Sequence, residues 1–181
     1  MTSETLAQPR RLTGNDLWLI FLAGVVGEIV LEFLAWVVFP NLVAMPPNFP
    51  MPDWVQALGP NVVGMPMQPH ILVTDLGRAI LGLELPVQLA MAIHLALGFF
   101  IMPYVYVKAR AALGIRSWVV ASVAYGVMLW LIAQSTLAPI AGRPIFLGFI
   151  GYTWGSLVGH VIYTVAVAWT YEHLRDRFAT R

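Results

Sequence analysis

Four ionisable residues, Glu28, Glu32, His94 and His160, lie deep inside apolar stretches of the sequence. A charged group at the centre of a bilayer costs about 3 kcal/mol on insertion scales, so such side chains face the interior of a helix bundle and find partners there. Glu28 and Glu32 are four residues apart and therefore share one face of a helix. Counting residues along the apolar stretches places all four at a similar depth. We expect them to form one polar cluster.

This cluster has four possible roles. Two carboxylates and two imidazoles suit a divalent metal such as zinc, iron or manganese, although the Glu-x-x-His pattern of di-iron bundles is absent. His94 and His160 would alternatively be the two axial ligands of haem b, with Gly98, Gly155 and Gly159 leaving room for the macrocycle. Stacked carboxyl and imidazole groups also suit a proton path. The last role is a hydrogen-bonded network that only holds the helices together.

A second candidate site combines two methionines and a histidine. Met65, Met67 and His70 lie within six residues of one another, and thioether and imidazole ligands of this kind suit Cu(I). The same methionines are also typical of an apolar loop that packs on lipid or on a partner protein, and we favour this interpretation.

The composition indicates which elements must position these residues. Of the 181 residues, 59% are hydrophobic and only 10% are charged, whereas soluble domains carry about 25% charged residues. Four stretches, at 17–39, 86–107, 117–138 and 145–171, each have the roughly 20 apolar residues that a helix needs to cross a bilayer. The sequence therefore predicts a single all-α domain, an integral membrane four-helix bundle. It contains no cysteine, which excludes disulfides and thiolate metal sites.

The positive charges predict the orientation of the four helices. Eight of the ten Lys and Arg residues lie in the two tails and the connection between the second and third stretches, and the other two are Arg78 and Arg143. Since positive side chains resist translocation, both termini are expected on the cytoplasmic side of the inner membrane. The long connection over 40–85 then lies outside, with a proline-rich first half and a short interfacial helix over 71–83.

Small residues at regular spacing indicate how the helices pack. Gly151, Gly155 and Gly159 form a doubled GxxxG pattern on one helix face, which favours tight packing against another helix. The other stretches carry similar small-residue pairs, which are Ala23 with Gly27, Ala90 with Gly98, and Ser122 with Gly126.

Several of these features together resemble a known family. They are His94 followed four residues later by Gly98, the run Gly-His-Val-Ile-Tyr over 159–163 before a short charged tail, four spans, and a proline-rich first outer loop. In these the chain resembles the small, mostly uncharacterised YagU-like inner-membrane proteins of bacteria. The resemblance implies a bacterial cytoplasmic membrane, and it implies no activity and no catalytic residues.

The function expected from the sequence is that of a polytopic membrane protein, a non-catalytic accessory subunit or assembly partner of a membrane complex. Its expected partners are the lipid bilayer and other membrane subunits or further copies of the chain, and no nucleic acid. An intramembrane metal- or haem-binding redox protein is the first alternative, and a proton-conducting or transport protein is the second. Hydrolase or transferase chemistry has no support, because the sequence has no serine elbow, P-loop or HExxH motif.

Overall fold

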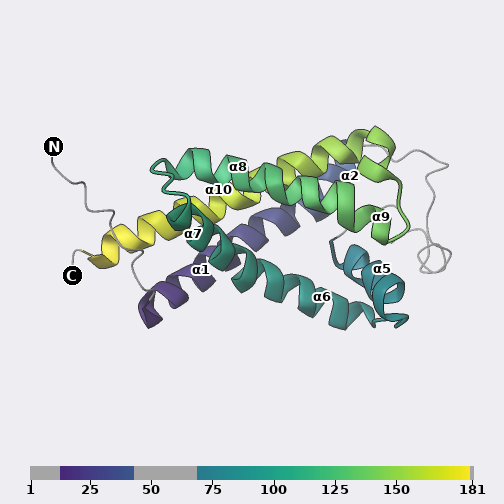
Figure 1. Ribbon diagram of the computed structural model, residues 1–181, viewed down its shortest axis with the longest axis horizontal. Coiled ribbons are helices and arrows are strands. Elements are labelled where there is room, and N and C mark those ends of the chain that lie inside the picture. Colours follow the sequence, from purple (N-terminus) through teal and green to yellow (C-terminus); the bar gives the residue numbers. More distant parts are fainter. Residues whose placement is uncertain (1–12, 43–68, 180–181) are drawn as a thin grey trace.

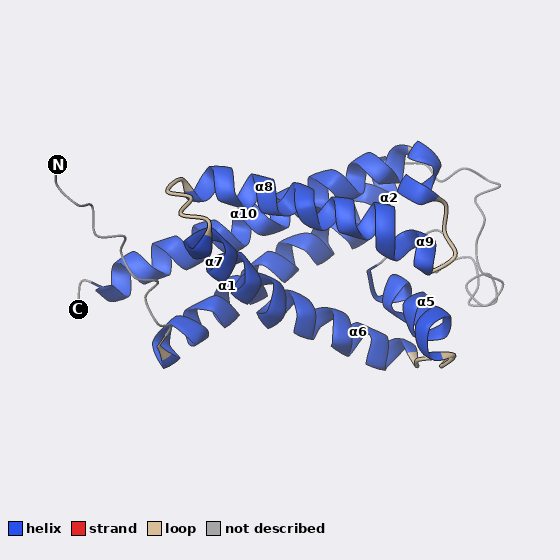
Figure 2. Ribbon diagram, in the orientation of Figure 1, coloured by secondary structure: helices blue, strands red, loops and turns tan. Residues whose placement is uncertain are grey.

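The computed structural model describes residues 13–42 and 69–179, and these residues form helices joined by short loops, with no strand among them (Figure 2). The prediction of an all-α protein is confirmed for this part of the chain. Two long helices, Val87–Ala112 and Trp118–Ile140, are long and apolar enough to cross a membrane. They coincide with the second and third predicted spans, to within a few residues at each end.

The first helix extends beyond the predicted 17–39 at both ends. α1 (Gly14–Phe33) continues through the π-helical segment η1 (Leu34–Val38) into α2 (Phe39–Leu42). It begins at a capping box, in which the Thr13 hydroxyl accepts a hydrogen bond from the Asp16 backbone N–H at 3.3 Å and the Asp16 carboxylate accepts one from the Thr13 N–H at 2.7 Å. These bonds satisfy backbone donors that a helix start otherwise leaves open, which fixes where the helix begins.

The middle of the chain forms a short helix and two long ones. α5 (Pro69–Leu81) precedes a long helix made of α6 (Val87–Ala96), the π-helical segment η2 (Leu97–Ile101) and α7 (Met102–Ala112). The next helix consists of α8 (Trp118–Ile132), a third π-helical segment η3 (Ala133–Leu137) and α9 (Ala138–Ile140). Ser117 caps the start of α8, because its hydroxyl accepts the Val120 N–H at 3.3 Å.

The last helix begins later than the sequence predicts. α10 (Gly151–Ala179) follows a 3-10 turn, η4 (Ile145–Phe149), whereas the predicted span starts at residue 145. Phe146 and Leu147 have positive φ angles of 48° and 51°, which no α-helix contains. The Thr153 hydroxyl donates to the Phe146 carbonyl at 2.6 Å and holds this turn against the start of α10. Hydrophobic patterning missed the turn because apolar residues form it.

The helices converge at the middle of the molecule and separate toward one end. α10 packs against both α1 and α8, and η2 packs against α1. The buried core between them includes Ile20, Ala23, Tyr106, Tyr163 and Val167. The start of α1 and the end of α10 lie at one end of the molecule, and at the other end α5 lies between α6 and α9 (Figure 1).

The small residues make the close contacts that their spacing indicates. Gly27 faces the ring of Tyr163, and a methyl group on Gly126 would lie 2.8 Å from the α-carbon of Val161 on α10. Gly155 and Gly159 instead face the ring of Phe39. A built β-carbon would lie 3.6 Å from the ring at Gly155, an ordinary contact, and 3.3 Å at Gly159, a tight one. These two glycines of the doubled GxxxG pattern are therefore covered by a side chain of the first helix, whereas Gly151 is exposed.

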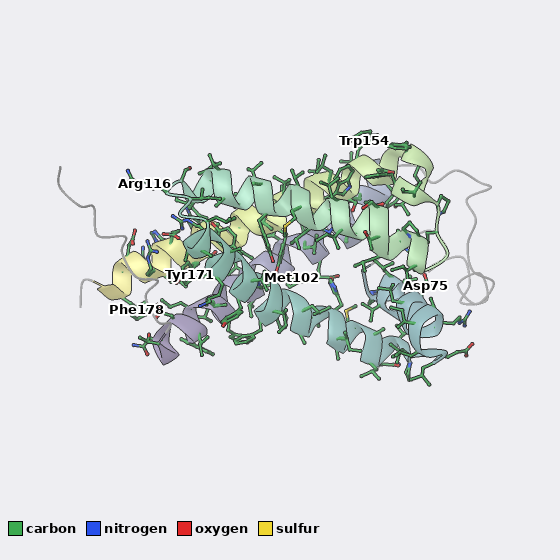
Figure 3. All side chains as sticks on the ribbon, in the orientation of Figure 1. Asp75, Met102, Arg116, Trp154, Tyr171 and Phe178 are labelled. Atoms are coloured by element: carbon green, nitrogen blue, oxygen red, sulfur yellow. The ribbon has the colours of Figure 1, made fainter. Side chains whose placement is uncertain are left out.

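α5 confirms the helix predicted at 71–83, with bounds two residues earlier. Two of its polar residues, Thr74 and Asp75, are buried, whereas Arg78 is exposed. Asp75 accepts two hydrogen bonds from Arg143, with an Nη2 to Oδ2 distance of 2.5 Å, and both side chains are almost fully buried. Figure 3 shows Asp75 at the end of the molecule where α5 lies. This ion pair ties α5 to the loop after α9.

Candidate metal centre

Three of the four ionisable residues singled out in the sequence lie together. α1 carries Glu28 and Glu32 one turn apart, and α6 carries His94 opposite them. The His94 Nε2 atom lies 3.2 Å from Glu28 Oε2 and 3.1 Å from Glu32 Oε1. One ligand atom from each residue lies within 4.8 Å of the other two. Two carboxylates and one imidazole nitrogen thus converge on a single point.

Gly98 makes room for the Glu28 carboxylate. Glu28 is 2% exposed, and a β-carbon built on Gly98 would overlap the Oε1 atom of its carboxylate. Gly98 therefore has a steric role in the cluster. The sequence suggested that this glycine leaves room for a macrocycle, but the structure shows the space taken by a carboxylate.

The hydrogen bonds within the cluster leave one buried oxygen without a partner. The imidazole bonds Glu32 through Nε2, and a single N–H makes one well-directed hydrogen bond. Glu28 Oε2 is buried and has no hydrogen bond within the described residues. Its contact with His94 Nε2, at 3.2 Å, is not a directed hydrogen bond, and a buried oxygen without one is costly. A cation at the point where the three ligand atoms converge would satisfy it.

His160 lies on α10, outside this three-residue group. Its Nδ1 atom donates to the Ser156 carbonyl at 2.7 Å, which leaves Nε2 as the nitrogen with a free lone pair. His160 lines the same cavity as Glu28 and His94. The sequence prediction of one cluster of four therefore corresponds to a three-residue group with His160 across a shared cavity.

His70 is the only member of the predicted copper site within the described residues, since Met65 and Met67 lie outside them. It is buried in the first turn of α5. Burial lowers the pKa of His70, the carboxylate of Glu32 acts in the opposite direction, and the imidazole of His94 lowers it further. His70 is therefore close enough to Glu32 on α1 and His94 on α6 for their charges to affect its pKa.

The cavity beside the cluster has a volume of about 260 Å³. Its walls are mostly apolar, with side chains from the first helix, α5, η3 and α10, and Met102, which lines it, lies at the centre of the molecule (Figure 3). Gln134 also lines it and was missed by sequence reasoning. The signal that could have identified Gln134 is that it is an isolated amide inside the stretch over 117–138, which is predicted to span the membrane.

Two hydroxyl groups on α10 bond to backbone carbonyls. Thr164 donates to the Ser122 carbonyl at 2.8 Å, and Thr153 donates to the Phe146 carbonyl. Bonds of this kind hold a helix against its neighbours. They favour a packing role for these two hydroxyls over a part in a proton path.

Fold and site together define a helical protein with a buried carboxylate and imidazole cluster beside an apolar cavity. No family model, curated protein or solved structure matches the chain. The resemblance to YagU-like membrane proteins stays a prediction.

Proposed function

We propose that the protein is a polytopic membrane protein that binds a divalent metal ion at Glu28, Glu32 and His94. The observation that carries this proposal is the position of His94 Nε2, which lies within 3.2 Å of one oxygen from each of two carboxylates. Zinc, manganese and iron(II) are the ions that such a mixed oxygen and nitrogen set suits.

The spacing of the ligand atoms fits a metal ion. Metal–nitrogen and metal–oxygen bonds of about 2.1 Å place neighbouring ligand atoms about 3.0 Å apart in an octahedron and about 3.4 Å apart in a tetrahedron. The two separations from His94 Nε2, 3.1 Å and 3.2 Å, lie between these values, and the two carboxylate oxygens lie within 4.8 Å of each other. Small side-chain movements would therefore be enough to coordinate an ion.

The repulsion between the two carboxylates also favours a bound cation. Two ionised carboxylates whose oxygens are no more than 4.8 Å apart repel each other by at least about 3 kcal/mol at an effective dielectric constant of 20. A divalent cation bound between the two carboxylates would neutralise both charges. The ion would also satisfy the Glu28 oxygen that lacks a hydrogen bond.

The alternatives have less support from the geometry. Haem b needs the Nε2 lone pair of His94, and both carboxylates approach that atom. A proton path along α10 has less support, because the hydroxyls of Thr153 and Thr164 donate to backbone carbonyls. An accessory-subunit role rests on size and composition, and it stays a prediction compatible with a bound metal.

The membrane location rests on a surface that is apolar where soluble proteins are polar. Side chains of Ile29, Phe33, Val120, Trp154 and Trp169 are each more than half exposed, while Glu28 is buried. Soluble monomers rarely expose apolar patches of this extent. Together with the two apolar helices, this supports a bundle of four spans whose first and last members are the helix over 14–42 and α10.

The distribution of charge supports cytoplasmic termini in a bacterial inner membrane. Arg116, Tyr171 and Phe178 lie at one end of the molecule, near the start of α1 (Figure 3). Arg78 and Arg143 belong to the elements at the opposite end, and each forms an ion pair with a carboxylate. The end rich in positive charge is therefore the one we place in the cytoplasm.

The metal site is tested by elemental analysis of the full chain purified in mild detergent and equilibrated in turn with zinc, manganese and iron(II). We expect one ion per chain, and loss of that ion in Glu32→Gln and in His94→Ala. Matched controls are Glu84→Gln, an exposed carboxylate, and His173→Ala, an exposed imidazole. A wild-type chain that retains no ion, or controls that lose it equally, would refute the proposal.

The orientation is tested with single cysteines, because the chain has none of its own. Leu83→Cys and Leu113→Cys change exposed residues in two different connections. A membrane-impermeant maleimide should label the cysteine at 83 in intact cells and the one at 113 only after permeabilisation. The reverse pattern would invert the topology, and equal labelling would argue against a membrane between the two positions.

A further inference from the structure

The cavity beside the metal centre has features of a ligand site that the metal does not explain. It holds about 260 Å³, just below the range of roughly 300 to 1,000 Å³ that is usual for small-molecule sites. Most of its lining is apolar, from residues such as Leu31, Leu76, Leu97 and Leu137. A well-formed apolar cavity with a few polar groups is the usual form of a binding site for a small molecule.

Two of the polar side chains that line the cavity away from the metal centre, Gln134 and His160, have an atom that can accept a hydrogen bond. Gln134, which is 6% exposed, donates from Nε2 to the Ser156 hydroxyl at 3.1 Å. Its other amide atom, Oε1, is buried and has no hydrogen bond within the described residues. A buried acceptor of this kind normally has a partner, either in the protein or in a bound molecule.

A second acceptor comes from His160, which lies four residues after Ser156 in α10. Its Nδ1–H bonds the Ser156 carbonyl, so that Nε2, on the opposite side of the ring, keeps its lone pair. Ser156 thus contacts both Gln134 and His160, and all three line the cavity. A ligand that carries a hydrogen-bond donor would satisfy these two acceptors in an otherwise apolar cavity.

We propose that this cavity binds a lipophilic alcohol or phenol, whose hydroxyl donates to Gln134 Oε1 and whose hydrocarbon part fills the apolar remainder. An anionic ligand is disfavoured by the Glu28 carboxylate in the same wall, and a cationic one by the Arg143 guanidinium. The proposal rests on Gln134, Ser156 and His160, and it does not require a metal ion at the neighbouring centre.

The first measurement compares two probes on the wild-type chain. Binding of 4-hexylphenol and of its methyl ether, 4-hexylanisole, would be measured by native mass spectrometry of the full chain in lipid nanodiscs. The two probes have the same hydrocarbon part, but only the phenol has a donor. We expect one phenol per chain and an affinity for the ether that is at least about fivefold weaker, as expected for the loss of one hydrogen bond. Equal affinities, or no saturable binding, would overturn the proposal.

The second measurement locates the site. Gln134→Leu should weaken phenol binding about fivefold while leaving ether binding nearly unchanged. Ser135→Ala is the matched control, because Ser135 is the next residue and its hydroxyl bonds the Leu131 carbonyl. Phenol binding by Gln134→Leu at the wild-type level would overturn the assignment to this cavity. Glu32→Gln, which tests the metal centre, should bind the phenol as the wild type does, so that the two proposals can fail separately.

Discussion

Replacing Gly98 with alanine is expected to disable the metal centre without changing any ligand. The new β-carbon would overlap the Glu28 carboxylate and would lie 2.7 Å from its Cγ atom. Gly24 packs α1 against the backbone carbonyls of Gly98 and Phe99, so moving the helices apart to relieve the new contact would lose this packing. The Glu28 side chain must therefore move.

The size of the effect follows from the required movement. The carboxylate has to shift by about 1 Å or more to reach an ordinary contact distance from the new methyl group. A metal–oxygen bond tolerates a deviation of only about 0.2 Å. Glu28 would thus be lost or badly placed as a ligand, and changes to groups that orient ligands typically cost 10- to 100-fold in metal affinity. We expect a loss in this range for Gly98→Ala.

The assay is a competition titration of zinc between the purified protein and a chromophoric chelator. Gly155→Ala is the matched control, since its β-carbon would lie 3.6 Å from the Phe39 ring, an ordinary contact. Wild-type zinc affinity in Gly98→Ala would refute the reasoning. So would an equal loss in Gly155→Ala, because the effect would then be a general one of added bulk.

Two further predictions concern the end of the molecule formed by α5. Arg143→Met should lower the free energy of unfolding by about 3 to 5 kcal/mol, because it leaves the Asp75 carboxylate buried without its cation, and the Asp75→Leu, Arg143→Met double variant should recover most of this loss in detergent unfolding experiments. Burial lowers the pKa of His70 below its ordinary 6.5, so the folded chain binds fewer protons than the unfolded chain. Stability should therefore fall as the pH decreases from about 6.5 toward that lowered pKa, and His70→Gln should flatten this slope between pH 7.5 and 5.5. An unchanged slope in His70→Gln would show that another group titrates.

The cluster of Glu28, Glu32 and His94 was largely predictable because its residues are costly where they lie. Glu28, Glu32 and His94 stand out in apolar surroundings, and depth along the helices correctly brought them to one level. Depth does not determine rotation about a helix axis, however. His160 satisfies one ring nitrogen within its own helix, and it lines the cavity without joining the three-residue group.

Contacts between distant loops could not be predicted from local pattern. Asp75 and Arg143 are 68 residues apart, and nothing in either neighbourhood indicates the other. The inward face of α5 carries polar residues, which is the reverse of what an amphipathic pattern at an interface predicts. His70 was grouped with the methionines beside it, although its structural neighbours belong to other helices. In each case the residues that interact are too far apart in the sequence for a local pattern to connect them.

The three π-helical segments affect how this chain should be aligned with others. A π turn holds one residue more than an α turn, so the side chains after it are rotated by about 100° relative to an uninterrupted α-helix. Phe39, which covers Gly155 and Gly159, follows such a segment. Deleting one residue from η1 would turn Phe39 away from those glycines while leaving Glu28 and Glu32 in place. Relatives of this chain can therefore differ from it by single-residue gaps at 34–38, 97–101 or 133–137, and a gap there alters the phase of a helix without shortening the fold.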